Sequence, residues 1–262
     1  MFLRLLVMAI SLCTMMAPWN FAESTDCNAP VVIIPDGRLT QSSFPQNTSY
    51  WYGIYAQARH SYSLEFEPPA DNYLNTVRPR FAPISVFAPT DVLPGCRGTS
   101  SVVITQNSGY APVIFVNSNG AGRRISFTAQ TAGLHVIQVT NVMGAGAYTF
   151  RAVDTTLIGI RWNTATGYDV LWTMLNVSDM PITGIFTALD MNGQVMAAVQ
   201  FGIPPGGRVA VSSASSSLNL PRNSVGSAMV SHNGPPNSIM AEAFLNGPTA
   251  SLPEKFEALT PR

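Results

Sequence analysis

Short segments in which apolar and polar residues alternate recur along almost the whole chain. In residues 60–67, Tyr62, Leu64 and Phe66 alternate with serine and glutamate side chains. A period of two places successive side chains on opposite faces of a β-strand, so each such segment predicts a strand with one buried face. Only 11% of the residues are charged, about half of the roughly 25% that is usual in globular domains. This composition argues against a coiled coil or a long surface helix, and we expect an all-β fold.

The predicted strands fall into two runs with a boundary near residue 155. The first run contains the segments 31–34, 50–57, 60–67, 84–88, 102–106, 124–129, 134–140 and 147–153. The second run contains the segments 157–162, 168–177, 182–189, 194–201, 208–212, 225–232 and 239–245. Each run has enough strands for a β-sandwich of its own. We therefore expect one domain at residues 23–155 and another at residues 156–262.

Two connections in the second domain have specific sequence signals. Residues 190–193, Asp-Met-Asn-Gly, predict a tight hairpin, because Asn-Gly tolerates the positive φ angles of such turns. The serine-rich segment 212–223 is expected to cross between two sheets as a long loop. Many short strands in about 100 residues suit an immunoglobulin-like sandwich, although the antibody cysteine pair is missing.

The first 22 residues have the order of an export signal. One arginine near the N-terminus precedes the apolar run 5–19, and cleavage is expected after Ala22, with the exact bond left open. The run is shorter than the roughly 20 apolar residues that a membrane span needs. We expect a mature chain without an integral membrane segment that is secreted, periplasmic or at the cell surface.

Cleavage removes Cys13 and leaves Cys27 and Cys96. In an oxidising compartment such a pair is usually joined. In the chain-entropy model the bridge would stabilise the fold by roughly 4 kcal/mol. The alternative is two separate buried thiols.

Three segments of the first domain resemble a known bacterial module. They are residues 125–129 (Ile-Ser-Phe-Thr-Ala), the Thr-Ala-Gly turn at 131–133 with the strand after it, and residues 146–150 (Gly-Ala-Tyr-Thr-Phe). They look like the signature of bacterial pre-peptidase C-terminal domains. Residues 156–262 are similar to a β-module found after such domains in exported bacterial proteins. The resemblance implies a jelly-roll-like sandwich followed by an immunoglobulin-like one in a secreted accessory protein, and it transfers no catalytic residue.

Catalytic and metal-binding signals are sparse. The chain has three histidines, His60, His135 and His232, and none lies in a hydrolase or zinc motif. We interpret them as surface or turn residues, and we expect no catalytic residues, no metal and no cofactor. The formal net charge is zero, which argues against nucleic acid as a partner.

The aromatic cluster at residues 50–55 is the best binding candidate. Tyr50 and Tyr52 share one face of the predicted strand, whereas Trp51 and Tyr55 share the other. One face can fill the core, and the other can offer Trp51 and Tyr55 to a neutral glycan or an apolar protein surface. The alternative is that neighbouring strands or the second domain cover both faces.

These observations favour an exported, non-catalytic protein with a binding, adhesive or spacer role. The alternative is a secreted hydrolase or protease accessory whose site is assembled from scattered loop residues. A histidine within hydrogen-bond reach of a serine and an acid, in one pocket, would favour the alternative.

Overall fold

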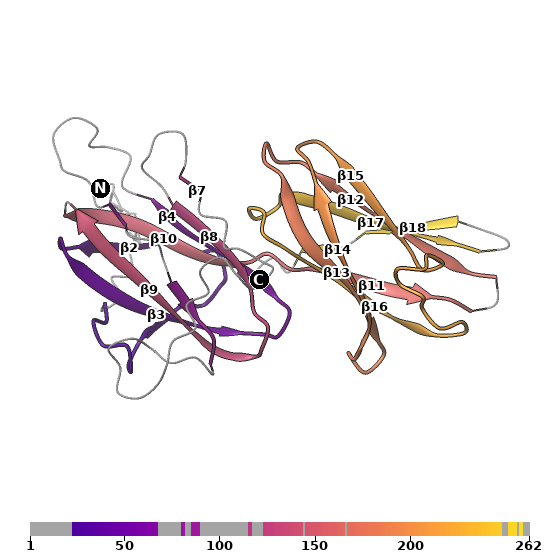
Figure 1. The fold of residues 1–262 in the computed structure, drawn as a ribbon, viewed down its shortest axis with the longest axis horizontal. Helices are drawn as coiled ribbons and strands as arrows, with labels where there is room; N and C mark the ends of the chain where they lie inside the picture. The colour runs from indigo at the N-terminus through magenta and orange to yellow at the C-terminus, as the bar shows by residue number, and fades with distance from the viewer. Residues whose placement is uncertain are drawn as a thin grey trace, which may run out of the picture.

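The computed structural model describes most of the chain after the predicted export signal. The described residues are 23–67, 80–81, 85–89, 115–116, 123–143, 145–165, 167–247, 251–255 and 257–258. Every named element in them is a β-strand, and the strands form four sheets (Figure 1). The expected all-β sandwich class is confirmed, while the predicted strand 102–106 lies outside the described residues. Within the described part of the chain, no helix is long and apolar enough to cross a membrane.

Strands β1 to β10 form the two sheets of a first sandwich. One sheet has the order β1 (Val31–Val32), β3 (Thr48–Ala56), β9 (Gly133–Met143) and β5 (Arg80–Phe81), with β6 (Ser85–Phe87) also paired to β9. The other sheet has the order β2 (Thr40–Phe44), β10 (Gly146–Asp154), β4 (Ser61–Glu67), β8 (Arg123–Thr128) and β7 (Phe115–Val116). Apolar side chains from both sheets form one buried cluster, which includes Tyr52, Ile54, Leu64, Phe66 and Phe150.

Strands β11 to β19 form a second sandwich. One sheet has the order β14 (Val195–Ile203), β13 (Ile182–Asp190), β16 (Val225–His232), β11 (Leu157–Asn163) and β19 (Glu257–Ala258). The other sheet has the order β15 (Arg208–Ser212), β12 (Asp169–Asn176), β17 (Ile239–Asn246) and β18 (Ser251–Lys255). A separate buried cluster fills this sandwich and includes Trp162, Trp172, Met174, Phe186 and Val230.

Two strands of the second sandwich pair differently from those of an immunoglobulin domain. In constant-type immunoglobulin domains the first strand pairs with the second, and the seventh pairs with the sixth. Here the first strand, β11, pairs with the sixth, β16, and the seventh strand, β17, pairs with the second, β12. The chain therefore shares the sandwich architecture expected from its sequence, with a different pairing of its first and seventh strands.

The predicted hairpin joins β13 to β14. Asp190 Oδ1 accepts hydrogen bonds from the backbone N–H groups of Asn192 and Gln194, both at 2.8 Å. Gly193 has a φ of +77°, a conformation that glycine adopts without steric cost. The hairpin forms where the Asn-Gly signal predicts it, with the positive φ at Gly193 and not at Asn192.

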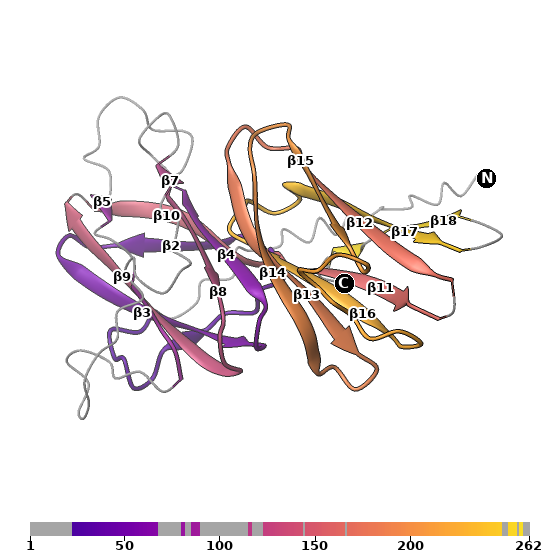
Figure 2. The same ribbon diagram turned by 45° about the vertical axis from the view of Figure 1, so that its right-hand side comes forward.

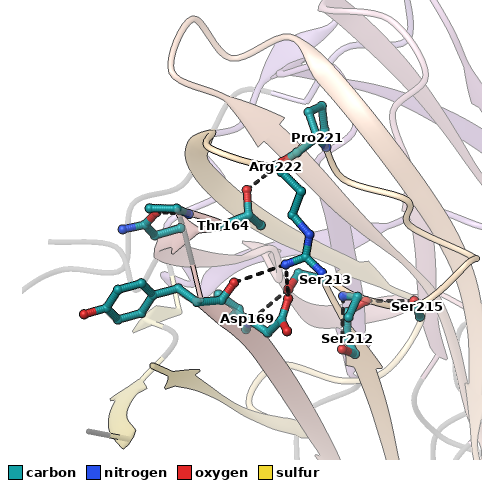
Figure 3. Close-up of polar contacts among 12 residues, drawn as sticks. Thr164, Asp169, Ser212, Ser213, Ser215, Pro221 and Arg222 are labelled. Atoms are coloured by element: carbon teal, nitrogen blue, oxygen red, sulfur yellow. Dashed lines mark hydrogen bonds and ion pairs between the residues drawn. The ribbon is translucent and has the colours of Figure 1, made fainter. Parts of the chain in front are cut away.

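The segment 212–223 leads from β15 in one sheet to β16 in the other, as expected for a crossing loop. Figure 3 shows how its two ends are held. At the β15 end, Ser213 Oγ donates to Asp169 Oδ1 at 3.4 Å, and at the β16 end Arg222 Nη1 donates to the same oxygen at 2.8 Å. These contacts hold the loop against the strands of the second sandwich. The polar side chains that make them therefore have a structural role.

Candidate functional site

The first sandwich has two outer strands on the same side, β1 in one sheet and β2 in the other. The chain between them crosses from sheet to sheet at residues 35–37. Gly37 N donates to the carbonyl of Ala152 at 2.8 Å, and Asp154 N donates to the carbonyl of Pro35 at 3.2 Å. The crossing segment thus ties the edge of the β1 sheet to β10 in the opposite sheet.

A groove of about 350 Å³, which we call the apolar edge groove, lies beside this crossing. Its lining residues are Val31, Val32, Ile33, Ile34, Asp36, Arg38, Leu39, Thr40 and Phe150. Because Phe150 belongs to the buried core, the groove extends from the surface to the space between the two sheets. Its volume lies within the range of roughly 300–1,000 Å³ that ligand sites occupy.

The walls of the groove are apolar and accessible. Ile34 is 70% exposed, Leu39 is 67% exposed and Val32 is 43% exposed. The charged residues form a pair, with Arg38 Nε 2.9 Å from Asp36 Oδ2, and the Arg38 side chain is largely in water. Such a pair contributes little to stability because water screens it. Several accessible apolar side chains gathered around a cleft are typical of a binding surface.

Tyr55 extends this surface on the neighbouring strand. β1 runs parallel to β3 with Val32 beside Gly53, and Ile33 N continues the ladder by donating to the carbonyl of Gly53 at 2.7 Å. The same register places Ile34 beside Tyr55, with both side chains on the outer face of the sheet. Tyr55 is 66% exposed and lies outside the lining of the groove, on the strand next to β1.

Trp51 lies on the same face as Tyr55 but is only 5% exposed. Its ring centroid is 6.0 Å from that of Phe87 on β6, and it belongs to a small buried cluster with Cys27 and Val136. The expectation that both aromatic residues are accessible is therefore wrong for Trp51, because residues distant in sequence cover that end of the strand. The ligand-binding role of both residues stays a prediction.

Cys27 is buried in the same cluster as Trp51 and is disulfide-bonded. Cys96 lies outside the described residues, so the pairing of these two cysteines stays a prediction.

The three histidines are all buried, which corrects the interpretation of them as surface or turn residues. His135 packs its ring against Phe127, with centroids 5.8 Å apart. His60 Nδ1 lies 2.7 Å from Asp154 Oδ2, an arrangement that resembles the base and acid of a hydrolase. Among the described residues, no serine hydroxyl forms a hydrogen bond with the His60 ring. The described residues therefore do not bring the histidine, serine and acid of such a site together.

His232 lies where the two sandwiches meet. Burial lowers the pKa of its imidazole to about 4, and its Nδ1 accepts a hydrogen bond from Gly234 N at 3.1 Å. Its own backbone N–H donates to Ser61 Oγ at 3.2 Å. The imidazole is therefore neutral at pH 7 and serves the packing of the junction.

Ser61 forms hydrogen bonds both to the linker and to the second sandwich. Besides the bond from His232 N, its Oγ accepts from Thr155 Oγ1 at 3.0 Å, and its N–H donates to Thr156 Oγ1 at 2.9 Å. Thr155 and Thr156 are the residues that link the sandwiches, and both are buried. The short linker is thus fixed against the first sandwich along its whole length.

No group of three or more histidine, cysteine, aspartate or glutamate residues within the described ranges is placed to hold a metal ion.

The apolar edge groove was not predicted from the sequence. The unbroken apolar run at residues 31–34 predicts a strand that is buried on both faces. Within the described part of the chain, β1 pairs only with β3, and Val32 and the following Ile34 are exposed. The signal that could have found it is the isolated Leu39, which follows the charged residues Asp36 and Arg38 in a segment otherwise rich in polar groups.

Comparisons with known proteins give no family. No family model matches the chain, and no curated protein matches it. Among solved structures, the extracellular region of zebrafish Gpr126/Adgrg6 is 11% identical, with a TM-score of 0.23 over 86% of this chain and 31% of that one. A glycosyl hydrolase family 2 member from Bacteroides cellulosilyticus is 8% identical, with a TM-score of 0.21 over 82% of this chain and 28% of that one. This chain spans less than a third of the length of either structure.

Proposed function

We propose that this chain is an exported, non-catalytic binding protein of the envelope or extracellular space, and that the apolar edge groove with Tyr55 is its binding surface. The observation that supports this proposal is the gathering of Val32, Ile34 and Leu39, all exposed, around a cleft that reaches Phe150, with Tyr55 exposed on the adjacent strand β3. Burial of apolar surface stabilises a complex by roughly 25 cal/mol per Å², so these side chains can contribute substantially to binding.

The composition of the surface favours an apolar protein surface over a neutral glycan. Sugar rings stack on flat aromatic faces, and Tyr55 is the single large aromatic side chain among the exposed apolar residues of the described chain. The other contacts are aliphatic and surround a cavity, which suits the insertion of apolar side chains from a partner.

The export signal and the resemblance to pre-peptidase C-terminal domains support an accessory role outside the cytoplasm. Such a compartment would also join Cys27 to Cys96, and we propose this bridge as the tether of the segment that leads into β1. Non-reducing peptide mapping of the exported protein should give one cross-linked fragment containing both cysteines, and two alkylatable thiols would contradict the bridge.

The accessibility of the groove can be measured with the dye 8-anilinonaphthalene-1-sulfonate, whose fluorescence rises on apolar protein surfaces. We expect Ile34→Ser and Leu39→Ser to weaken dye binding severalfold. Met240→Ser is the matched control, because Met240 is 58% exposed on β17, away from the groove. Equal effects of all three variants would contradict a specific groove.

The partner class can be tested by a binding screen of residues 23–262 against immobilised neutral glycans and purified extracellular proteins. We expect protein partners whose affinity falls about tenfold in the double variant Ile34→Ser/Leu39→Ser, or about 1.4 kcal/mol. Because the surface is apolar, the affinity should change little with salt. Binding that is confined to glycans, or that collapses at moderate salt, would contradict the proposal. Turnover of a substrate that is lost on changing His60 would favour the enzyme hypothesis instead.

A further inference from the structure

β14 is a long outer strand that carries no charge. It is the last strand of its sheet and lies outside β13 at one margin of the second sandwich (Figure 2). Its nine residues, Val-Met-Ala-Ala-Val-Gln-Phe-Gly-Ile, include no charged residue and no proline. Natural outer strands are usually protected from pairing with other chains by lysine, proline, bulges or a covering segment. The ladder with β13 shifts register only near the hairpin tip, so β14 is regular from Ala197 to Ile203.

The register shows which backbone groups of β14 point away from its partner. Thr183 on β13 accepts a hydrogen bond from Asn233 N, on the β16 side. Backbone direction alternates along a strand, so Gly184, Phe186 and Ala188 point toward β14, where they face Phe201, Val199 and Ala197. The backbone N–H and C=O groups of the intervening residues in the regular part of β14, which are Ala198, Gln200 and Gly202, therefore point outward.

These outward residues are accessible. All of them are exposed, and a Cβ atom added to Gly202 would meet no heavy atom within 4 Å. On the inner face, Ala197 and Val199 are only partly buried against the core. An additional strand would thus gain a row of backbone hydrogen bonds and cover apolar surface that the isolated sheet leaves in contact with water.

We propose that a second copy of this chain pairs with β14 through its own β14, antiparallel and about a two-fold axis at Val199. The charges at the two ends of the strand select this partner. Asp190 lies at the hairpin end, and Arg208 follows the turn at the other end. An antiparallel copy brings the acidic end of each strand to the basic end of the other, whereas a parallel strand would bring like charges together. An isologous arrangement of this kind closes as a dimer.

The two-fold axis fixes the facing residues. Ala198 of one copy faces Gln200 of the other, Met196 faces the open space at Gly202, and the two Val199 side chains meet on the inner face. No like charges oppose each other, and small residues face larger ones. The interface leaves the apolar edge groove free, because the groove lies in the first sandwich.

Sedimentation velocity of the exported full chain over a range of concentrations tests the proposal. We expect a reversible dimer, with slowed amide hydrogen exchange at Ala198, Gln200 and Gly202 as the concentration rises. Ala198→Pro removes an outward N–H without breaking the ladder to β13, so it should raise the dimer dissociation constant at least about tenfold while the chain stays folded. Met240→Lys, an exposed change on β17, should leave the dissociation constant unchanged.

A pair of double variants tests the register itself. Ala198→Lys/Gln200→Lys places lysine opposite lysine in both symmetric pairs and should abolish the dimer. Ala198→Lys/Gln200→Glu places lysine opposite glutamate and should retain it. A chain that is monomeric at all concentrations, a dimer insensitive to Ala198→Pro, or equal behaviour of the two double variants would overturn the proposal.

Discussion

The two sandwiches present open edges of different kinds. In the first sandwich, the outer strand β1 has two residues and borders a cleft that reaches the core at Phe150. In the second, the outer strand β14 has nine residues and a continuous row of outward backbone groups. Both edges carry few charges, so charge alone does not distinguish them. A short edge beside a cleft suits inserted side chains, whereas a long regular edge suits a whole strand.

The largest expected effect is the difference in stability between variants of Trp51 and Tyr55, the two aromatic residues on one face of β3. Trp51→Ala removes a ring that is packed against Phe87 and should lower the free energy of unfolding by about 3–5 kcal/mol. Tyr55→Ala should change it by less than about 1 kcal/mol because the side chain is largely in water. Urea denaturation of both variants measures the difference. Similar losses for the two would show that Tyr55 also has a packing role.

Proline substitutions test which backbone N–H groups of β14 point toward β13 and which point away from it. Ala197→Pro removes an N–H that points toward β13 and should cost about 3 kcal/mol, whereas Ala198→Pro should cost about 1 kcal/mol or less. The free energy of unfolding should be measured at a concentration where the chain is monomeric. The reverse order of the two losses would mean that Ala197, and not Ala198, directs its N–H away from β13.

A pH titration tests the junction between the two sandwiches, where His232 is buried. His232 has a folded-state pKa of about 4, below the ordinary value of 6.5, so the unfolded chain binds a proton first as the pH falls. The contribution of neutral His232 to the free energy of unfolding is fully present above pH 6.5 and is lost as the pH falls toward 4. The loss amounts to about 3 kcal/mol. His232→Gln should be less stable at pH 7 and should lack this part of the pH dependence. An unchanged profile in the variant would assign the pH dependence to other groups.

The smallest effect is expected at the charged margin of the groove. Arg38→Ala removes one partner of an exposed ion pair and should change the free energy of unfolding by less than about 0.5 kcal/mol. Binding of 8-anilinonaphthalene-1-sulfonate should change by less than about twofold, provided that the groove binds through its apolar walls. A large loss of affinity would mean that the two open edges differ in electrostatics as well as in shape.

The alternating segments of the sequence predicted most of the strands, because period two is a local property of a half-buried strand. β4 and β10 follow this pattern closely and were predicted within a residue or two of their ends. β2, with the sequence Thr-Gln-Ser-Ser-Phe, was missed because its side chains do not alternate. It is held in place by pairing with β10, which is remote in sequence.

The candidate site was less predictable than the strands. The sequence places Trp51 and Tyr55 on one face, but only the fold brings Phe87 over Trp51 and leaves Tyr55 open. Ile34 is 70% exposed although it belongs to an apolar run, which the run itself does not reveal. Long-range pairing, rather than local pattern, therefore determines which apolar residues form a surface.

The fixed linker at Ser61 has a mechanical consequence. Hydrogen bonds join this one residue of β4 to Thr155, Thr156 and His232, so tension that separates the sandwiches loads all of them at once. Bonds loaded together resist a pulling force better than bonds that break one after another. A partner held in the groove and a second copy held at β14 would then be kept at a set spacing, and a tether built from this chain would transmit force between them with little stretch.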